Sequence, residues 1–490
     1  MVVCARAQQA AADAAQLLQP QVASAPAPGQ AFARWRSPRM SPSFLFVMDS
    51  RYLQLSWALD GYRRSRVPLV AYEQGKFLAA GFADDPGIYF FIPIMSSALH
   101  LSLPRSIDLF LGCIIAIGFG VGATGVLRFT KTVTGRVLAI TLLVCLLFLT
   151  VLIGDVYVVQ SSFALAVIPW GAFLTGPAGL GRRAIVLAFI LGISGYVINT
   201  IRTHAGTVPL MFIAIIIFGM HERAVKKIIF ALAATLGFVL AMGVFNIVIH
   251  QRNTYLAAKD RTYHPVIAHH PMWHTIYAGL GFLQNDYGMK YDDSVPIAKV
   301  HSVDPHAEYL SPEYERVLER EVLSFTAAHP AFVAGTLAVK LGVLLFTFLI
   351  CANLGLIATV RYVKPWPIET AFAVGLVFTS LPSVLAVPHI SYMLGYIAFG
   401  ILYGIISLEY GLQRRRTHVS TDVNSILDSY PCKRPPITGA HEACFVAGYR
   451  RNRAGKKGLN GVVAHLESWM HKTIASTIGQ DRILELGAEI

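Results

Sequence analysis

Nine apolar stretches dominate the sequence from residue 107 to residue 411, and they constrain the fold more than any other feature. A helix needs about 20 mostly apolar residues to cross the hydrocarbon core of a bilayer. Only 14% of the residues are charged, whereas ordinary soluble domains carry about 25%. We therefore expect an all-α polytopic membrane protein with about nine transmembrane helices and one large loop domain. The candidate spans are residues 107–127, 137–153, 158–178, 184–200, 207–220, 228–249, 335–360, 367–386 and 391–411.

Basic residues occupy every second connection between these stretches. The positive-inside rule assigns such connections to the cytoplasm. We therefore expect an integral protein of the cytoplasmic (inner) membrane of a bacterium, with a cytoplasmic C-terminus and a periplasmic active face. The net charge of +13 follows from this orientation signal, so no nucleic-acid partner is expected. The basic residues are Arg128, Lys131 and Arg136; Arg182 and Arg183; Arg223, Lys226 and Lys227; Arg361 and Lys364; and Arg414, Arg415 and Arg416.

The N-terminal part of the chain contains no good span. Its apolar run at residues 44–59 is interrupted by Asp49 and Arg51, and charges are costly inside a bilayer. With nine spans and a cytoplasmic C-terminus, we expect a tenth helix to be missing or poorly formed here. The predicted domains are a partly disordered N-terminal segment at 1–75, a membrane domain at 76–416 with an extracytoplasmic loop at 250–333, and a basic cytoplasmic tail at 417–490.

Two adjacent acids, Asp84 and Asp85, precede an apolar segment on the predicted outer face. Neighbouring carboxylates repel one another, which tends to raise one pKa and suits a proton acceptor. The acids are therefore the candidate catalytic residues. Pro86 and Gly87 follow as a turn signal, so the alternative is that the pair only caps a helix.

Arg202 and His204 lie at another outer turn, and Asp155 lies in a short outer loop. The planar guanidinium of arginine binds phosphate oxygens in a bidentate manner, so Arg202 and His204 are candidates for binding a donor phosphate. The alternative for Arg202 is an arginine that snorkels to the membrane surface. Asp155 is a candidate substrate contact, and the alternative is a solvated or capping residue.

The segment 250–333 is rich in histidine and aromatic residues. His270 and His274 are spaced to share one helical face and could bind a metal, but no HExxH motif is present, so a structural or substrate-contacting cluster is favoured and no metal ligand is assigned. No cofactor is required by these patterns, and a divalent cation is the candidate that the histidines leave open. The candidate substrate contacts in this segment are His270, Trp273, His274 and Tyr277, beside His264, His269, Asp292 and Asp293.

An acidic pair in the first outer loop, followed by an apolar helix, many spans and one large outer loop, resembles the GT-C glycosyltransferases. These enzymes use polyprenyl-phosphate sugars and include protein mannosyltransferases and aminoarabinose transferases. The resemblance covers residues 80 to 411 and implies that Asp84 or Asp85 is the catalytic base or orients the acceptor. It also implies that Arg202 contacts the lipid phosphate. The family has a transmembrane helix before the acidic loop, and this sequence does not show one.

The final residues, Glu485-Leu486-Gly487-Ala488-Glu489-Ile490, resemble the first glycine-rich strand end of a class I S-adenosylmethionine methyltransferase. A second glycine and the rest of the sheet are absent from the sequence, so we expect no methyltransferase activity. Together with the N-terminal part, this segment suggests a chain that is altered at both ends.

These patterns predict a membrane glycosyltransferase that transfers a sugar from a polyprenyl-phosphate donor to an acceptor on the extracytoplasmic face. The expected partners are membrane lipid and the polyprenyl-phosphate sugar. The alternatives are a transporter or flippase for a lipid-linked glycan, or an inactive membrane remnant of such an enzyme. Transporters usually carry ionisable groups at mid-membrane, and here Lys340 is the main charge within a span.

Overall fold

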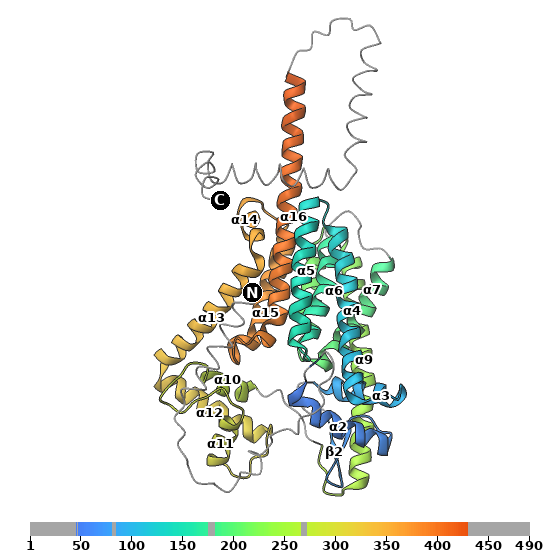
Figure 1. Ribbon diagram of the computed structural model, residues 1–490, viewed down its shortest axis with the longest axis vertical. Coiled ribbons are helices and arrows are strands. Elements are labelled where there is room, and N and C mark those ends of the chain that lie inside the picture. The colour runs from blue at the N-terminus through green and yellow to red at the C-terminus, as the bar shows by residue number, and fades with distance from the viewer. Residues whose placement is uncertain (1–45, 47, 81–84, 175–181, 266–271, 430–490) are drawn as a thin grey trace, which may run out of the picture. The chain divides into compact units, whose positions relative to one another are not determined.

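The computed structural model describes residue 46 and residues 48–80, 85–174, 182–265 and 272–429, which are mainly helical (Figure 1). The chain divides into two compact units, Met1–Arg415 and Arg416–Ile490, and of the second only residues 416–429 are described. Among the described residues, seven helices are long and apolar enough to cross a membrane, as a polytopic membrane protein requires. They are α4 (Leu103–Phe129), α5 (Val133–Ile153), α7 (Arg182–Ile201), α9 (Ala224–Lys259), α13 (Pro330–Ala352), α15 (Trp366–Leu385) and α16 (Ile390–Ser429).

Two of the nine expected spans are shorter helices in the described part of the chain. They are α6 (Val158–Leu174) and α8 (Thr207–Gly219). Helix α8 has 13 residues and rises about 20 Å, which is less than the hydrocarbon core of a bilayer. Its Phe212 and Ile216 are fully buried, because α8 packs between α6 and α15. A short apolar stretch of this kind is typical of a core helix.

Residues 49–79 form a helix and a hairpin, whereas residues 1–45, the first part of the segment predicted to be partly disordered, lie outside the described residues. Helix α2 (Asp49–Ser65) packs against α3 (Pro86–Ala98) and strand β1 (Val70–Glu73). Strand β1 pairs antiparallel with β2 (Lys76–Ala79), so the described part is not entirely helical. Between the strands, Gln74 and Gly75 both have positive φ angles, as a tight hairpin turn requires.

Glycines allow two pairs of helices to approach closely. A side chain at Gly192 of α7 would collide with the carbonyl oxygen of Ala234 in α9. A side chain at Gly237 of α9 would collide with the carbonyl oxygen of Phe189 in α7. Gly118 and Gly122 of α4 approach the backbone of α6 in the same way. Small residues at such crossings are a general feature of membrane helix packing.

The helices differ strongly in burial. In α16, 83% of the most apolar window is buried by other parts of the protein, whereas in α9 and α13 the share is 17%. Helix α16 is therefore the core of the bundle, and the exposed apolar faces of α9 and α13 are suited to lipid.

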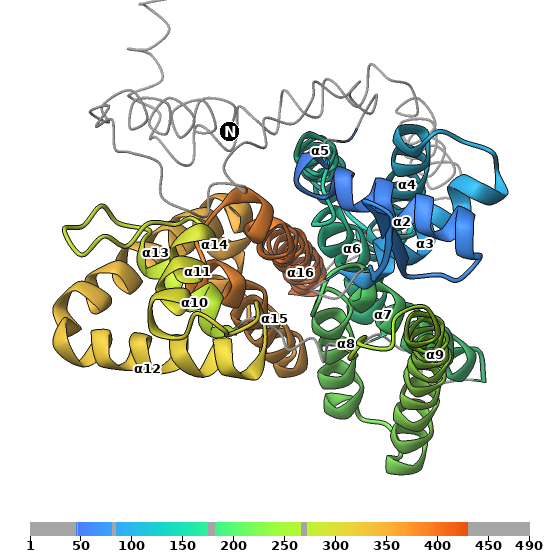
Figure 2. The same cartoon turned by 90° about the horizontal axis from the view of Figure 1, so that it is seen from below.

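A second, smaller core lies outside these helices. Helices α10 (Met272–Leu280), α11 (Ser294–Val303) and α12 (Pro312–Ala328) pack together beside α13 (Figure 1 and Figure 2). We call residues 272–328 the loop block. Its core includes Val300, Tyr314 and Leu318, which are fully buried. The remaining helix, α14 (Leu354–Arg361), follows α13.

Several basic connections meet at one end of the bundle, which we call the basic end. The buried Glu409 of α16 accepts hydrogen bonds from the backbone N–H groups of Lys131 (2.7 Å) and Thr132 (3.1 Å) between α4 and α5. Lys364, between α14 and α15, donates to Ser407 of α16 (2.7 Å). Gly219, at the end of α8, packs against Pro367.

Candidate functional site

Arg51, in the first turn of α2, joins two acids that are far apart in the sequence. Its Nε donates to Asp85 Oδ2, and its Nη1 lies 3.4 and 3.3 Å from Asp155 Oδ1 and Oδ2. The exposed fraction is 18% for the Arg51 side chain, 6% for Asp85 and 21% for Asp155. We call these three residues the acid–arginine cluster. It lies at the end of the bundle opposite the basic end.

Local backbone features place both acids. Asp85 immediately precedes α3, whose helix begins at Pro86, but its side chain does not cap that helix. The carboxylate faces Arg51 instead, so the capping alternative is wrong for Asp85. Asp155 follows Gly154, which ends α5 in a left-handed conformation, and its Oδ1 accepts from the Val156 N–H (2.6 Å).

The electrostatics of the acid–arginine cluster keep its cation charged. Burial lowers the pKa of Arg51, but Asp85 and Asp155 raise it by a larger amount. The neighbouring Tyr89 donates its hydroxyl proton to Gln54 Oε1 (2.6 Å). Burial raises the pKa of Tyr89, and Asp85 adds to this effect, so the Tyr89 hydroxyl stays protonated at neutral pH.

Arg202 lies close to the cluster. Its guanidinium carbon is 4.6 Å from the centre of the Tyr157 ring, and Tyr157 is two residues after Asp155. The structure therefore brings Arg202 and Asp155 into one region. The turn that carries Arg202 is held by Asn199, whose Oδ1 accepts from the N–H groups of Gly206 (2.8 Å) and Thr207 (3.1 Å).

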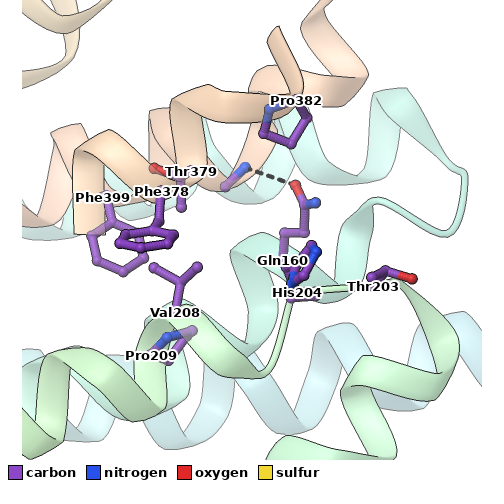
Figure 3. Close-up of a pocket in the computed structure, with 11 residues that line it drawn as sticks. Gln160, Thr203, His204, Val208, Pro209, Phe378, Thr379, Pro382 and Phe399 are labelled. Atoms are coloured by element: carbon purple, nitrogen blue, oxygen red, sulfur yellow. Dashed lines mark hydrogen bonds between the residues drawn. The ribbon is translucent and has the colours of Figure 1, made fainter. Parts of the chain in front are cut away.

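His204 adopts a positive φ of 67° in the same turn and lines a small pocket between α6, α8, α15 and α16. In Figure 3, Thr203 and His204 lie beside Gln160, which is one helical turn beyond Tyr157. The Gln160 Oε1 accepts a hydrogen bond from the Gly395 N–H (3.3 Å). The opposite wall is apolar and includes Val208, Phe378 and Phe399. His204 thus lines a cavity whose other lining residues are uncharged, and none of them belongs to the acid–arginine cluster.

The predicted substrate contacts of the loop block belong mostly to its core. His274 is 5% exposed, and its ring nitrogens contact the Tyr314 hydroxyl (2.7 Å) and Asp293 Oδ1 (3.3 Å). Tyr277 is also buried, and the Trp273 N–H donates to Glu315 Oε2 (2.8 Å). This arrangement favours the structural alternative for His274 and Tyr277.

Other predicted site residues cannot be placed. Asp84, His269 and His270 lie outside the described residues, so the pairs Asp84–Asp85 and His270–His274 stay predictions. Within the described ranges, no group of three or more histidines, cysteines or acids could hold a metal ion.

Sequence reasoning missed the role of Arg51. In the sequence, Arg51 stands out as a charge that interrupts the apolar run at residues 44–59. That interruption was the available signal, since a charge in an apolar segment needs a partner. The partners themselves, 34 and 104 residues away along the chain, could not be identified without the fold.

Comparisons of the chain with family models, with curated proteins and with solved structures found no match. The candidate function therefore rests on the residues of this chain and on their arrangement.

Proposed function

We propose that the protein is an integral membrane glycosyltransferase that moves a sugar from a polyprenyl-phosphate donor to an acceptor hydroxyl at the extracytoplasmic face. The observation that carries this proposal is the acid–arginine cluster, where Arg51 joins Asp85 and Asp155 at the end of the apolar helices. Such a transfer needs a proton acceptor for the incoming hydroxyl and cations for the departing phosphate.

The two carboxylates have different surroundings, which suggests different roles. Asp85 is the more buried acid and binds Arg51 closely, so we assign it to hold that guanidinium in place. Asp155 is more exposed, and its oxygens lie 3.3 Å or more from Arg51. We therefore assign Asp155, rather than Asp85, as the proton acceptor.

The proposed reaction uses Arg202 for the donor phosphate. The acceptor oxygen forms a bond with the anomeric carbon of the sugar, while the bond from that carbon to the phosphate oxygen breaks. The acceptor proton passes to Asp155, and polyprenyl phosphate leaves with the bonding electron pair. Arg202, near Asp155 through Tyr157, would stabilise the charge that develops on the phosphate.

An assay of sugar transfer tests this proposal. Purified protein in nanodiscs is supplied with polyprenyl phosphates that carry radiolabelled sugars, and release of the sugar from the lipid is measured. We expect Asp155→Asn to lower kcat by about 10²–10⁴-fold, the usual contribution of a general base. Asp60→Asn, an exposed acid on α2, is the matched control and should keep wild-type activity. Full activity of Asp155→Asn would overturn the assignment.

The alternative functions give different results in the same preparation. Lys340 of α13 is buried, but its Nζ donates to the carbonyl oxygens of Val384 (3.0 Å) and Ala386 (2.5 Å). These carbonyls lie at the C-terminal end of α15, where the last carbonyls lack partners within the helix. The charge of Lys340 therefore has a structural explanation, which favours a transferase over a transporter. A transporter or flippase would move substrate across proteoliposomes without forming a glycosidic bond, and an inactive remnant would do neither.

A further inference from the structure

Three tyrosines lead from the loop block to the acid–arginine cluster. The Tyr291 hydroxyl, between α10 and α11, donates to the Tyr392 hydroxyl at the start of α16 (3.0 Å). The ring of Tyr392 meets the ring of Tyr157 edge to face, with 5.1 Å between their centres. Tyr157 in turn carries the Arg202 guanidinium on its face. The row therefore connects three segments that are distant in sequence.

The position of Tyr291 is set by the loop block. Before it, Asn285 Oδ1 accepts from the N–H groups of Tyr287 (3.1 Å) and Met289 (3.2 Å). After it, Asp292 Oδ1 accepts from the Ser294 N–H (2.8 Å) at the start of α11. These bonds fix the segment on both sides of Tyr291, so the position of the Tyr291 hydroxyl depends on the position of the loop block.

Tyr157, the one of the three tyrosines that contacts Arg202, is buried. Tyr157 is 7% exposed. Burial raises the pKa of Tyr157, Arg202 lowers it and Tyr392 raises it again, with a net rise. Tyr157 therefore stays neutral at physiological pH.

Stacking on Tyr157 sets the orientation of the Arg202 guanidinium. A guanidinium that stacks on an aromatic face keeps its N–H donors at its edge, where they can meet phosphate oxygens. The guanidinium lies over the Tyr157 ring, and that ring packs against the ring of Tyr392. A change at Tyr392 would therefore shift the donors of Arg202.

We infer that Tyr392 is a positioning residue, which couples the position of the loop block to the position of the Arg202 guanidinium. Tyr392 thereby sets the affinity of the protein for the phosphate of the lipid donor. The inference rests on the proposed function for the identity of the anion. It assigns the loop block a role in completing the site, although its buried His274 contacts Tyr314 and Asp293 within the block itself.

Binding of undecaprenyl phosphate to the full-length protein in phosphatidylcholine nanodiscs tests this inference. Tyr392→Phe and Tyr291→Phe each remove one hydroxyl, and each should weaken binding about threefold to tenfold, as the loss of one hydrogen bond predicts. The double variant should bind no more weakly than Tyr392→Phe, because both changes break the same Tyr291–Tyr392 hydrogen bond. Tyr287→Phe, in the same segment, is the control and should bind as the wild type does. Wild-type affinity for Tyr392→Phe, or additive losses in the double variant, would overturn the inference.

Hydrogen exchange in the absence of lipid separates this inference from the proposed function. In Tyr392→Phe, backbone amides should exchange faster both at residues 285–293 and at residues 201–206, while Tyr287→Phe should affect only the first segment. If the wild type does not bind the probe, the proposed function fails, and the exchange result alone decides the link. Faster exchange confined to the residues that adjoin Tyr392 in the sequence, at the start of α16, would refute the link.

Discussion

At the basic end, the Glu409 carboxylate is completely buried and accepts four hydrogen bonds of 2.7–3.1 Å, from Lys131, Thr132 and Gln413. At the opposite end, Asp155 keeps 21% of its side chain exposed and lies 3.3 Å or more from its guanidinium partner. Both acids fix helices to one another. Only Asp155 retains an accessible surface that a substrate could reach.

This comparison shows that one buried acid can serve the stability of the fold while another acid, partly exposed, is suited to chemistry. A carboxylate whose lone pairs are filled by the protein stabilises one packing arrangement, and it has little capacity left for a substrate. A carboxylate that is partly open can exchange a protein partner for a substrate hydroxyl. The Arg51–Asp85 pair combines both properties, because the buried Asp85 holds a cation that also reaches Asp155.

The largest effect on stability is expected from Arg51→Met. This change leaves the buried Asp85 carboxylate without its guanidinium, which typically costs about 3–5 kcal/mol. Chemical denaturation in detergent would measure the loss. Adding Asp85→Asn should restore part of it, because the unpaired charge is then removed. A loss below about 1 kcal/mol for the single variant would show that the pair is not coupled as described.

A smaller loss is expected from Glu409→Gln at the basic end. The amide cannot accept all the bonds that the carboxylate accepts, and hydrogen bonds to charged groups contribute about 1.5–3 kcal/mol. The unfolding free energy should fall by about that amount. The exposed Glu313, which pairs with Arg316 at the surface of the loop block, is the matched control, and Glu313→Gln should cost less than about 0.5 kcal/mol. Equal losses in the two variants would contradict the structural role of Glu409.

The smallest effect concerns the pH dependence of stability at the basic end. Burial lowers the pKa of Lys364, and Glu369 raises it only in part. The unfolded chain therefore keeps this proton to a higher pH than the folded protein does. Its contribution to stability is complete above the ordinary lysine pKa of about 10.4 and is lost as the pH falls through the lowered pKa of the folded protein.

Lys364→Arg tests this sign, because arginine does not titrate in this range. Unfolding temperatures measured from pH 8 to pH 10 should rise more steeply, or fall less steeply, with pH in the wild type than in the variant. Parallel curves would mean that Lys364 does not titrate differently in the folded protein.

Much of the membrane architecture could be predicted from the long apolar stretches and from the basic residues that connect them. Seven of the nine predicted spans correspond to helices that are long enough to cross a membrane. The length of α8 was the weak point, because hydropathy does not distinguish a lipid-facing helix from one such as α8, whose Phe212 is covered by Phe372 and Phe399. The hairpin was missed although Gln74-Gly75 is a plausible turn signal, since strands of four residues carry little periodicity.

The site was predictable only in pieces. The sequence indicates Arg202 because a guanidinium binds phosphate oxygens, and Asp155 because it lies in a short outer loop. In the structure Asp155 belongs to the acid–arginine cluster, and Arg202 lies near it through Tyr157. Arg51, Tyr157 and Tyr392 were not chosen, because their roles depend on contacts between distant segments. Asp85 was chosen as a proton acceptor, and its burial against Arg51 suggests a positioning role instead.

The central claim is that chemistry takes place at the open acid of one end and not at the saturated acid of the other. The most direct test is the rate of sugar release from a polyprenyl-phosphate donor by Asp155→Asn and by Glu409→Gln, measured at a temperature where both variants are folded. We predict that Asp155→Asn is at least about 100-fold slower than the wild type, whereas Glu409→Gln turns over at close to the wild-type rate per folded molecule. Equal rates for the two variants would contradict the claim.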